Sequence, residues 1–188
     1  MSRNSENKTR GAFTPFTFEG EKNKITDTQI LAKNFYRSGI QYFAAATVLS
    51  AKIGINFEGE TTPLIGPSVT NGAFACELFL KSLHCHYKKE VVRGHDLLEL
   101  FNALPEKPEN VRASIASYFA NQTTYLASQE RQAFSADDLV KKIKGISNAF
   151  IEARYVSERG FSTFNQSFIA CFCEALYEEC KKVQQTAY

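Results

Sequence analysis

Residues Asn71–Phe101, NGAFACELFLKSLHCHYKKEVVRGHDLLELF, decide the fold of this chain. Apolar residues in this stretch recur at the spacing of one buried helical face. They are Cys76, Phe79, Leu80, Leu83 and Tyr87. Other apolar residues cover much of the remaining circumference, so the sequence predicts a central rather than a peripheral helix. A short basic connector follows it, and Gly94-His95-Asp96 opens a second short helix.

A narrow polar stripe runs along the same predicted helix, formed by Glu77, Lys81, His84 and Lys88. Glu77 and Lys81 stand at i, i+4 in the favourable order, which contributes only about 0.2–0.5 kcal/mol on an exposed helix. In a buried helix the two charges must be paired, because an unpaired buried charge is costly. We therefore expect a polar network that fixes the register of neighbouring helices, with a ligand-facing or RNA-facing site as the alternative.

Other polar residues are candidates for this network. Arg154 lies in line with apolar residues of a later predicted helix, so its guanidinium needs a carboxylate partner. Glu77, Asp96 and Glu158 are the candidates, and Glu158 is only one helical turn away. We expect Glu77 and Lys81 to bind Arg154 and Asp96.

His95 and Asp96 stand where the second short helix begins. Asp96 can cap the start of that helix or interact favourably with its dipole. The unperturbed pKa of a histidine lies near neutrality, so His95 is the candidate general base if the protein is an enzyme. No activated nucleophile motif accompanies it, and capping with packing is the expected role of the pair.

A metal site is not expected from the histidines and cysteines. Residues 84 and 86 of His84-Cys85-His86 point about 200° apart on a helix, so they cannot bind one ion together. Tetrahedral sites prefer spacings such as C-x2-C or H-x3-H, and Cys171-x-Cys173 fails for the same reason. We expect no metal and no cofactor.

Composition and charge limit the class of protein. The chain has 188 residues and a net charge of +2, which residues 1–25 account for with five Lys/Arg against three Asp/Glu. The near-neutral remainder excludes the strong basic field of a nonspecific nucleic-acid binder, although Lys88, Lys89 and Arg93 form a local basic cluster. The start has no apolar signal region, no apolar run would span a membrane, and the cysteine count of five is odd. We expect reduced core thiols and a cytoplasmic protein.

The remaining pattern predicts an all-α fold, an up-down antiparallel bundle of five or six helices with an extended N-terminal arm. Residues 1–25 form the arm, whose Phe16 and Phe18 pack on the same body or on a second subunit, and residues 26–188 form the bundle. A helix runs from Asp27 to Lys52, and residues 53–66 form an irregular connection. Later helices follow Pro108, extend from a capping box at Ser135–Asp138 through Arg154, and span about residues 164–183.

Three segments resemble motifs of HEPN domains. Ala75–Leu83, ACELFLKSL, resembles the central-helix signature of that family, a glutamate and a lysine among apolar residues. Gly94–Phe101, GHDLLELF, resembles the segment that follows it, and Glu152–Glu158, EARYVSE, resembles an RYxxE element near the penultimate helix of some branches. Their order and separation agree with the family, and the resemblance covers roughly residues 27–185.

The resemblance implies a helical bundle that is commonly a homodimer. Members are linked to RNA metabolism, toxin–antitoxin pairs or defence against phage, and some partner a nucleotidyltransferase. The family positions retained here form a candidate binding site, namely Glu77, Lys81, His95, Asp96, Arg154, Tyr155 and Glu158.

The ribonuclease motif of the active branch, an arginine four to six residues from a histidine, is not present. The only histidines are His84, His86 and His95, and Arg93 stands just two residues before His95. We therefore expect a non-catalytic domain that dimerises and binds a protein partner, a nucleotide or RNA. Two alternatives remain open. One is a divergent metal-independent ribonuclease that uses His95 with Arg93 or Arg154, and the other is a structural subunit of a larger complex.

Overall fold

The structure, a computed structural model, describes residues 27–52, 54–57, 60–62, 64–107, 110–122, 136–154 and 165–185. The side chains of 55–57, 60–62, 136, 153 and 154 fall outside this description. The predicted N-terminal arm and the predicted cap at Ser135 also lie outside the described residues. The elements are α1 (Thr28–Ser50), β1 (Ile55–Phe57), β2 (Glu60–Thr62), α2 (Ile65–Tyr87), α3 (Leu97–Asn102), α4 (Val111–Ala120), α6 (Ala136–Lys144), α7 (Ala149–Arg154) and α9 (Gln166–Gln185).

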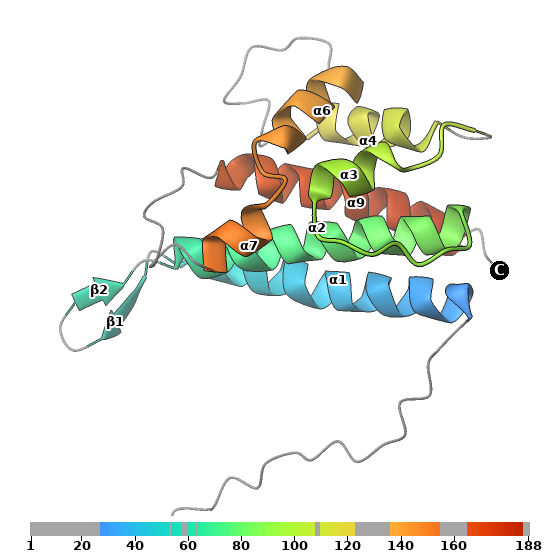
Figure 1. The fold of residues 1–188 in the computed structure, drawn as a ribbon. Coiled ribbons are helices and arrows are strands. Elements are labelled where there is room, and N and C mark those ends of the chain that lie inside the picture. Colours follow the sequence, from blue (N-terminus) through green and yellow to red (C-terminus); the bar gives the residue numbers. More distant parts are fainter. Residues whose placement is uncertain are drawn as a thin grey trace, which may run out of the picture.

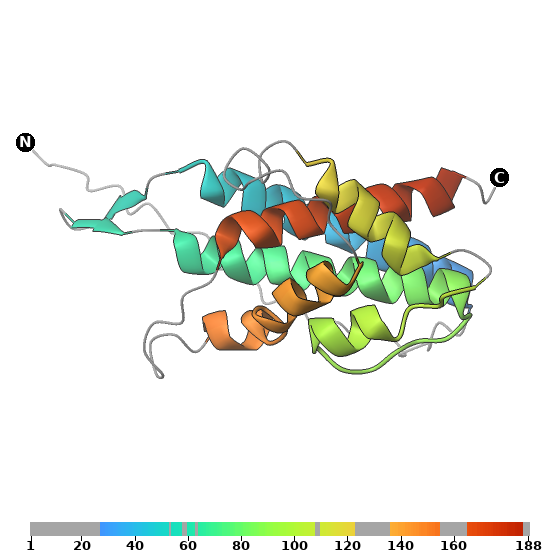
Figure 2. The same cartoon turned by 90° about the horizontal axis from the view of Figure 1, so that it is seen from above.

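The prediction of an all-α helical bundle is confirmed. Helix α2 lies at its centre and packs against α1, α9, α7 and α3 (Figure 1). Helices α1 and α2 run antiparallel, whereas α9 runs in the same direction as α2 (Figures 1 and 2). None of the described helices is both long enough and apolar enough to cross a membrane.

Helix α1 begins and ends close to the predicted positions. The carboxylate of Asp27 accepts hydrogen bonds from the backbone N–H groups of Gln29 and Ile30, which satisfies donors that have no partner within the helix. Residues 55–57 and 60–62 of the predicted irregular connection instead pair as a short antiparallel hairpin, with Ile55 opposite Thr62. The strands are three residues each, too short for the alternating pattern that reveals a strand.

Close contact between α1 and α2 depends on small residues. A Cβ atom at Gly39 would lie only 2.6 Å from the ring of Phe79. The two helices can approach this closely because glycine has no side chain. The hydroxyl of Ser82 donates to the carbonyl oxygen of Ala32 at 2.8 Å, across the same interface. These contacts hold the second half of α2 against the first half of α1.

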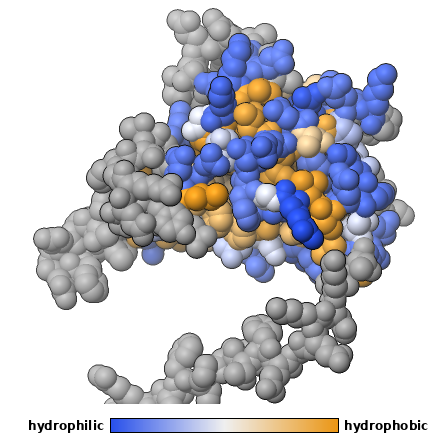
Figure 3. All heavy atoms as spheres, in the orientation of Figure 1, coloured by the Kyte–Doolittle hydropathy of each residue, from blue (hydrophilic) through white to orange (hydrophobic). Residues whose placement is uncertain are grey.

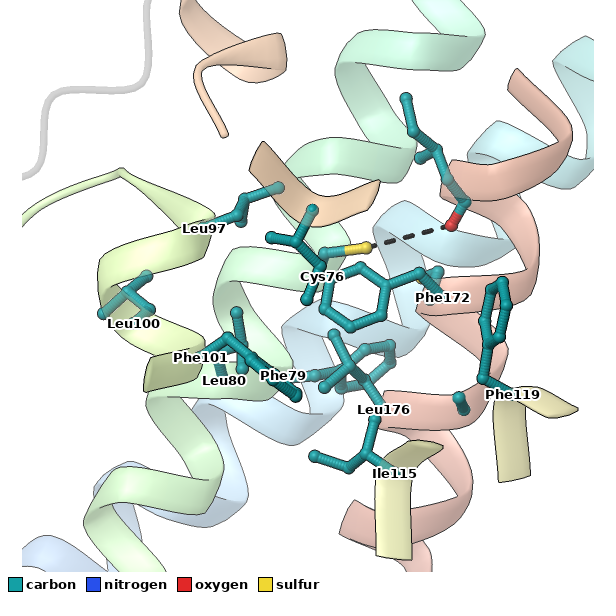
Figure 4. Packing of buried hydrophobic residues seen from close by; sticks show 14 of the residues in the cluster. Cys76, Phe79, Leu80, Leu97, Leu100, Phe101, Ile115, Phe119, Phe172 and Leu176 are labelled. Carbon is teal, nitrogen blue, oxygen red and sulfur yellow. Dashed lines mark hydrogen bonds between the residues drawn. The ribbon is translucent and has the colours of Figure 1, made fainter. Parts of the chain in front are cut away.

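The core lies between α2, α3, α4 and α9. Side chains from all four helices interlock there, among them Cys76, Phe79, Leu97, Leu100, Phe101, Ile115, Phe119, Phe172 and Leu176 (Figure 4). The five cysteines are all buried, which confirms their predicted position in the core. The thiols of Cys76 and Cys180 point at the carbonyl oxygens of Ile169 and Phe79. Burial raises the pKa of Cys173 and Cys180 well above the usual value.

The helix predicted to continue through Arg154 is interrupted, so that part of the prediction was wrong. Helix α6 ends at Lys144, residues 145–148 form a turn, and α7 begins at Ala149. Gly145 stands where α6 ends, and glycine is common just past a helix end. The carbonyl oxygen of Ser147 in this turn accepts a hydrogen bond from the backbone N–H of Leu97, which ties the turn to the start of α3.

Candidate functional site

The candidate site is built around the carboxylate of Glu77 on α2. This side chain is only 2% exposed, and its Oε1 accepts a hydrogen bond from Lys81 Nζ at 2.7 Å. His95 Nδ1 lies 3.0 Å from Oε1 and 3.1 Å from Oε2 of the same carboxylate. The site therefore joins the predicted i, i+4 pair to a histidine from the segment before α3.

The connector between α2 and α3 returns the chain to this carboxylate. It turns through two residues with positive φ, Lys89 at 55° and Gly94 at 105°. The second value is one that glycine adopts and other residues rarely do. Directly after it, Asp96 caps α3 by accepting from the N–H groups of Leu98 and Glu99. A glycine turn on one side and a helix cap on the other thus fix the position of His95.

Aromatic side chains pack around the same region. The ring of His95 lies 6.2 Å from that of Phe150 on α7, at an interplanar angle of 33°. Phe150 in turn stacks on Phe74 at 4.7 Å, and Tyr42 meets Phe74 edge-on at 4.6 Å. Low-polarity surroundings strengthen the interactions of a buried carboxylate with its partners.

His95 is the most exposed member of the group. Its side chain is 54% exposed, against 13% for Lys81. Because the carboxylate of Glu77 accepts but does not donate when ionised, the contact makes Nδ1 the donor of the ring and leaves Nε2 at the other edge. Among the residues that the structure describes, no side chain bonds Nε2. The Glu77 carboxylate thus orients the imidazole of His95 through Nδ1, and Nε2 can contact a ligand.

The connector beside His95 is basic. Lys88, Lys89 and Arg93 are exposed, and Glu90 is the acidic residue among them. Lys88 Nζ lies 2.7 Å from Glu90 Oε1, and this ammonium lowers the pKa of the Glu90 carboxyl. The charges of Lys88 and Glu90 cancel, so Lys89 and Arg93 carry the local excess of positive charge. Hydrophilic residues predominate on much of the face seen in Figure 3, around smaller apolar areas.

The predicted site residues therefore have different outcomes. Glu77, Lys81 and His95 come together. The expected contact of Glu77 and Lys81 with Asp96 was wrong, because the Asp96 carboxylate is used as the cap of α3. Arg154 is the last residue of α7, but its side chain lies outside the described residues, as do Tyr155 and Glu158 entirely.

The other histidines do not join the site. His84 is buried, and its Nε2–H donates to the carbonyl oxygen of Leu100 at 2.8 Å. Burial lowers the pKa of His84, so the ring is neutral and links α2 to α3. His86 instead meets the ring of Tyr87 edge-on at 4.9 Å. Within the described ranges, no three potential metal ligands gather at one place.

A second buried carboxylate was missed from the sequence. Glu179 on α9 is fully buried, and it accepts from the hydroxyl of Tyr87 at 2.9 Å and from that of Ser114 at 2.6 Å. The contacts join α9 to α2 and α4. Glu179 stands three residues after the buried Leu176 and four before the buried Val183, so the helical period does place it inward.

No protein-family model matches the chain, and neither the curated proteins nor the solved structures include one that is significantly similar to it.

Proposed function

We propose that this chain is a HEPN-like domain that binds phosphate groups of RNA or of a nucleotide, with His95 as the ligand-facing side chain. The observation that carries the proposal is the contact between His95 Nδ1 and the buried Glu77, which leaves Nε2 on a 54% exposed ring. The HEPN-like motifs in residues 75–83 and 94–101 supply the class of protein. The expected setting is a cytoplasmic homodimer in a defence, toxin–antitoxin or RNA-related system, with a nucleotidyltransferase or another protein as its partner.

The charges around His95 favour an anionic ligand. When its ring is protonated, a histidine whose Nδ1–H is bonded to a carboxylate can donate from Nε2 to a phosphate oxygen. Lys89 and Arg93 are exposed on the adjacent connector and would add charge-assisted contacts. The buried Lys81 is already bonded to Glu77, so we assign it to holding the carboxylate rather than to the ligand.

A second candidate function is a ribonuclease, because the same contact is that of a carboxylate orienting a general base. In this mechanism His95 Nε2 would accept the proton of a ribose 2′-hydroxyl. The 2′-oxygen would attack the phosphorus as the bond to the 5′-oxygen breaks, and the leaving oxygen would take a proton from water, giving a cyclic phosphate and a 5′-hydroxyl. Arg93 would stabilise the charge that develops on the phosphate oxygens.

Binding of fluorescein-labelled single-stranded RNA by the full-length protein tests both functions. We expect His95→Ala to weaken binding about tenfold, a loss of about 1.4 kcal/mol. His86→Ala, which changes a histidine outside the site, is the matched control and should bind like the wild type. No effect of His95→Ala, or no binding of RNA and nucleotides at all, would overturn the proposal.

The same samples distinguish binding from cleavage. Under the binding proposal the labelled RNA remains intact after incubation with protein free of contaminating nuclease. Cleavage by the wild type that disappears in a folded His95→Ala variant would establish the ribonuclease instead. Cleavage that persists in the variant would exclude His95 as the base.

The proposed homodimer has its own test. Light scattering at high micromolar protein concentration should give twice the mass of one chain, which is 21.1 kDa. A mass equal to that of a single chain would refute the dimer while leaving the ligand proposal open to the binding experiment.

A further inference from the structure

A groove of about 440 Å³ opens between α1 and α9, on the opposite side of α2 from α3 and α7. Its apolar surface comes from Phe43 and Ala46 on α1, Val69 on α2, and Ile169 and Tyr177 on α9. The ring of Tyr177 also stacks on that of Tyr36 on α1, with the centroids 6.0 Å apart. The groove lies on the part of α1 nearest the β1–β2 hairpin.

The charged side chains among the described lining residues are both acidic, Glu174 and Glu178. Glu178 lies 3.4 Å from Lys181, so part of its charge is balanced. Glu174 is exposed and has no ion-pair partner among the residues that the structure describes. An apolar groove with an unbalanced carboxylate at its rim suits a ligand that is both apolar and basic.

The sequence of the chain contains such a ligand. Residues 8–18, KTRGAFTPFTF, combine two basic residues with three phenylalanines and include no acidic residue. They precede α1 by nine residues or more, and α1 is the helix that forms one wall of the groove.

The chain is long enough to reach the groove within one molecule. From Asp27 to the groove the α1 axis rises by roughly 24 Å at Phe43 and roughly 34 Å at Ser50, at 1.5 Å per residue. An extended chain covers about 3.3 Å per residue. The nine residues from Phe18 to Asp27 therefore span up to about 30 Å, and the eleven from Phe16 span up to about 36 Å.

We propose that residues 8–18 dock in this groove of their own molecule, with phenylalanines on the apolar floor and Arg10 against Glu174. The pairing of apolar with apolar surface stabilises the docked segment, and the charges fix its direction. The groove is then an internal docking site for the N-terminal segment, separate from the Glu77–His95 site on the other side of α2.

Tryptophan fluorescence tests this in the full-length protein. The natural chain has no tryptophan, so Phe16→Trp introduces a single reporter. We expect blue-shifted emission relative to the urea-unfolded protein, at every protein concentration. Adding Glu174→Lys, or Arg10→Glu, should shift the emission to the red, and combining the two reversals should restore it. Glu99→Lys makes the same charge change on an exposed residue of α3 and should leave the emission unchanged.

Each other result overturns the proposal. Emission of Phe16→Trp equal to that of the unfolded chain means that the segment is not docked. A blue shift that survives both charge reversals means that it docks elsewhere, and one that disappears on dilution means that it docks on a second copy. Because Arg10 precedes the helical body, Arg10→Glu still gives an answer if Glu174→Lys fails to fold.

Discussion

Glu77 and Glu179 are two buried carboxylates of one bundle with different partners. Glu77 is bonded to a cationic lysine on its own helix and to a histidine that is more than half exposed. Glu179 is bonded to two neutral hydroxyls, those of Tyr87 and Ser114, which belong to neighbouring helices. Both acids are buried, whereas only Glu77 has a partner side chain that is more than half exposed, because Tyr87 and Ser114 are half-buried.

The difference separates a candidate site from a structural link. A carboxylate whose partners are two neutral hydroxyls of neighbouring helices fixes the packing of three helices and presents no exposed imidazole to a ligand. A carboxylate that holds an exposed imidazole can set the tautomer and the orientation of the ring for a ligand outside. The position of the partners, rather than the buried acid itself, therefore assigns the function.

Removing the Glu77 carboxylate should produce the largest loss of stability. Glu77→Ala leaves the Lys81 ammonium, which is 13% exposed, without its partner, and we expect a loss of about 3 kcal/mol in the free energy of unfolding. Urea denaturation followed by circular dichroism measures it. Glu99→Ala, on the exposed surface of α3, should change stability by less than about 0.5 kcal/mol. An unchanged midpoint for Glu77→Ala would mean that Lys81 does not depend on this partner.

Neutralising the second carboxylate should have a smaller effect. Glu179→Gln keeps the volume of the side chain and one carbonyl acceptor, and its two partners carry no charge. We expect a loss of about 1 kcal/mol, less than that of Glu77→Gln measured in the same way. Equal losses for the two glutamine variants would contradict the distinction between charged and neutral partners.

We expect the smallest effect from His84, as a change in how the free energy of unfolding depends on pH. Burial lowers its pKa below the usual 6.5, so in acid the unfolded chain binds a proton that the folded chain does not. The contribution of His84 to stability is complete above the usual pKa and is lost as the pH falls through the window between the usual and the lowered value. We expect His84→Gln to lose less stability than the wild type between about pH 7.5 and pH 5. Parallel losses would show that His84 does not titrate differently in the two states.

The helices and the central position of α2 follow from local patterns in the sequence. The spacing of Phe79, Leu80 and Leu83 and the caps at Asp27 and Asp96 are properties of short segments, and the structure reproduces them. The pairing of Glu77 with Lys81 is equally local, because one helical turn fixes it. The interruption at Gly145 was missed because apolar residues continue through it at helical spacing.

Contacts between distant segments could not be predicted in the same way. The Glu77–His95 contact depends on the path of the connector, which two residues with positive φ determine. Asp96 had two uses open to it, capping α3 or pairing with Lys81, and only the tertiary structure decides between them. Glu179 lay on the inward face of its helix, but Tyr87 and Ser114 are 92 and 65 residues away.

The buried cysteines give the protein a reporter of its own opening. The thiolate is the form of cysteine that reacts with alkylating reagents. Burial keeps Cys173 and Cys180 in the thiol form. Because both lie on α9, where it packs against α2, their labelling requires the separation of these two helices. The rate of labelling under native conditions therefore measures how often the centre of the bundle comes apart, without any added probe in the sequence.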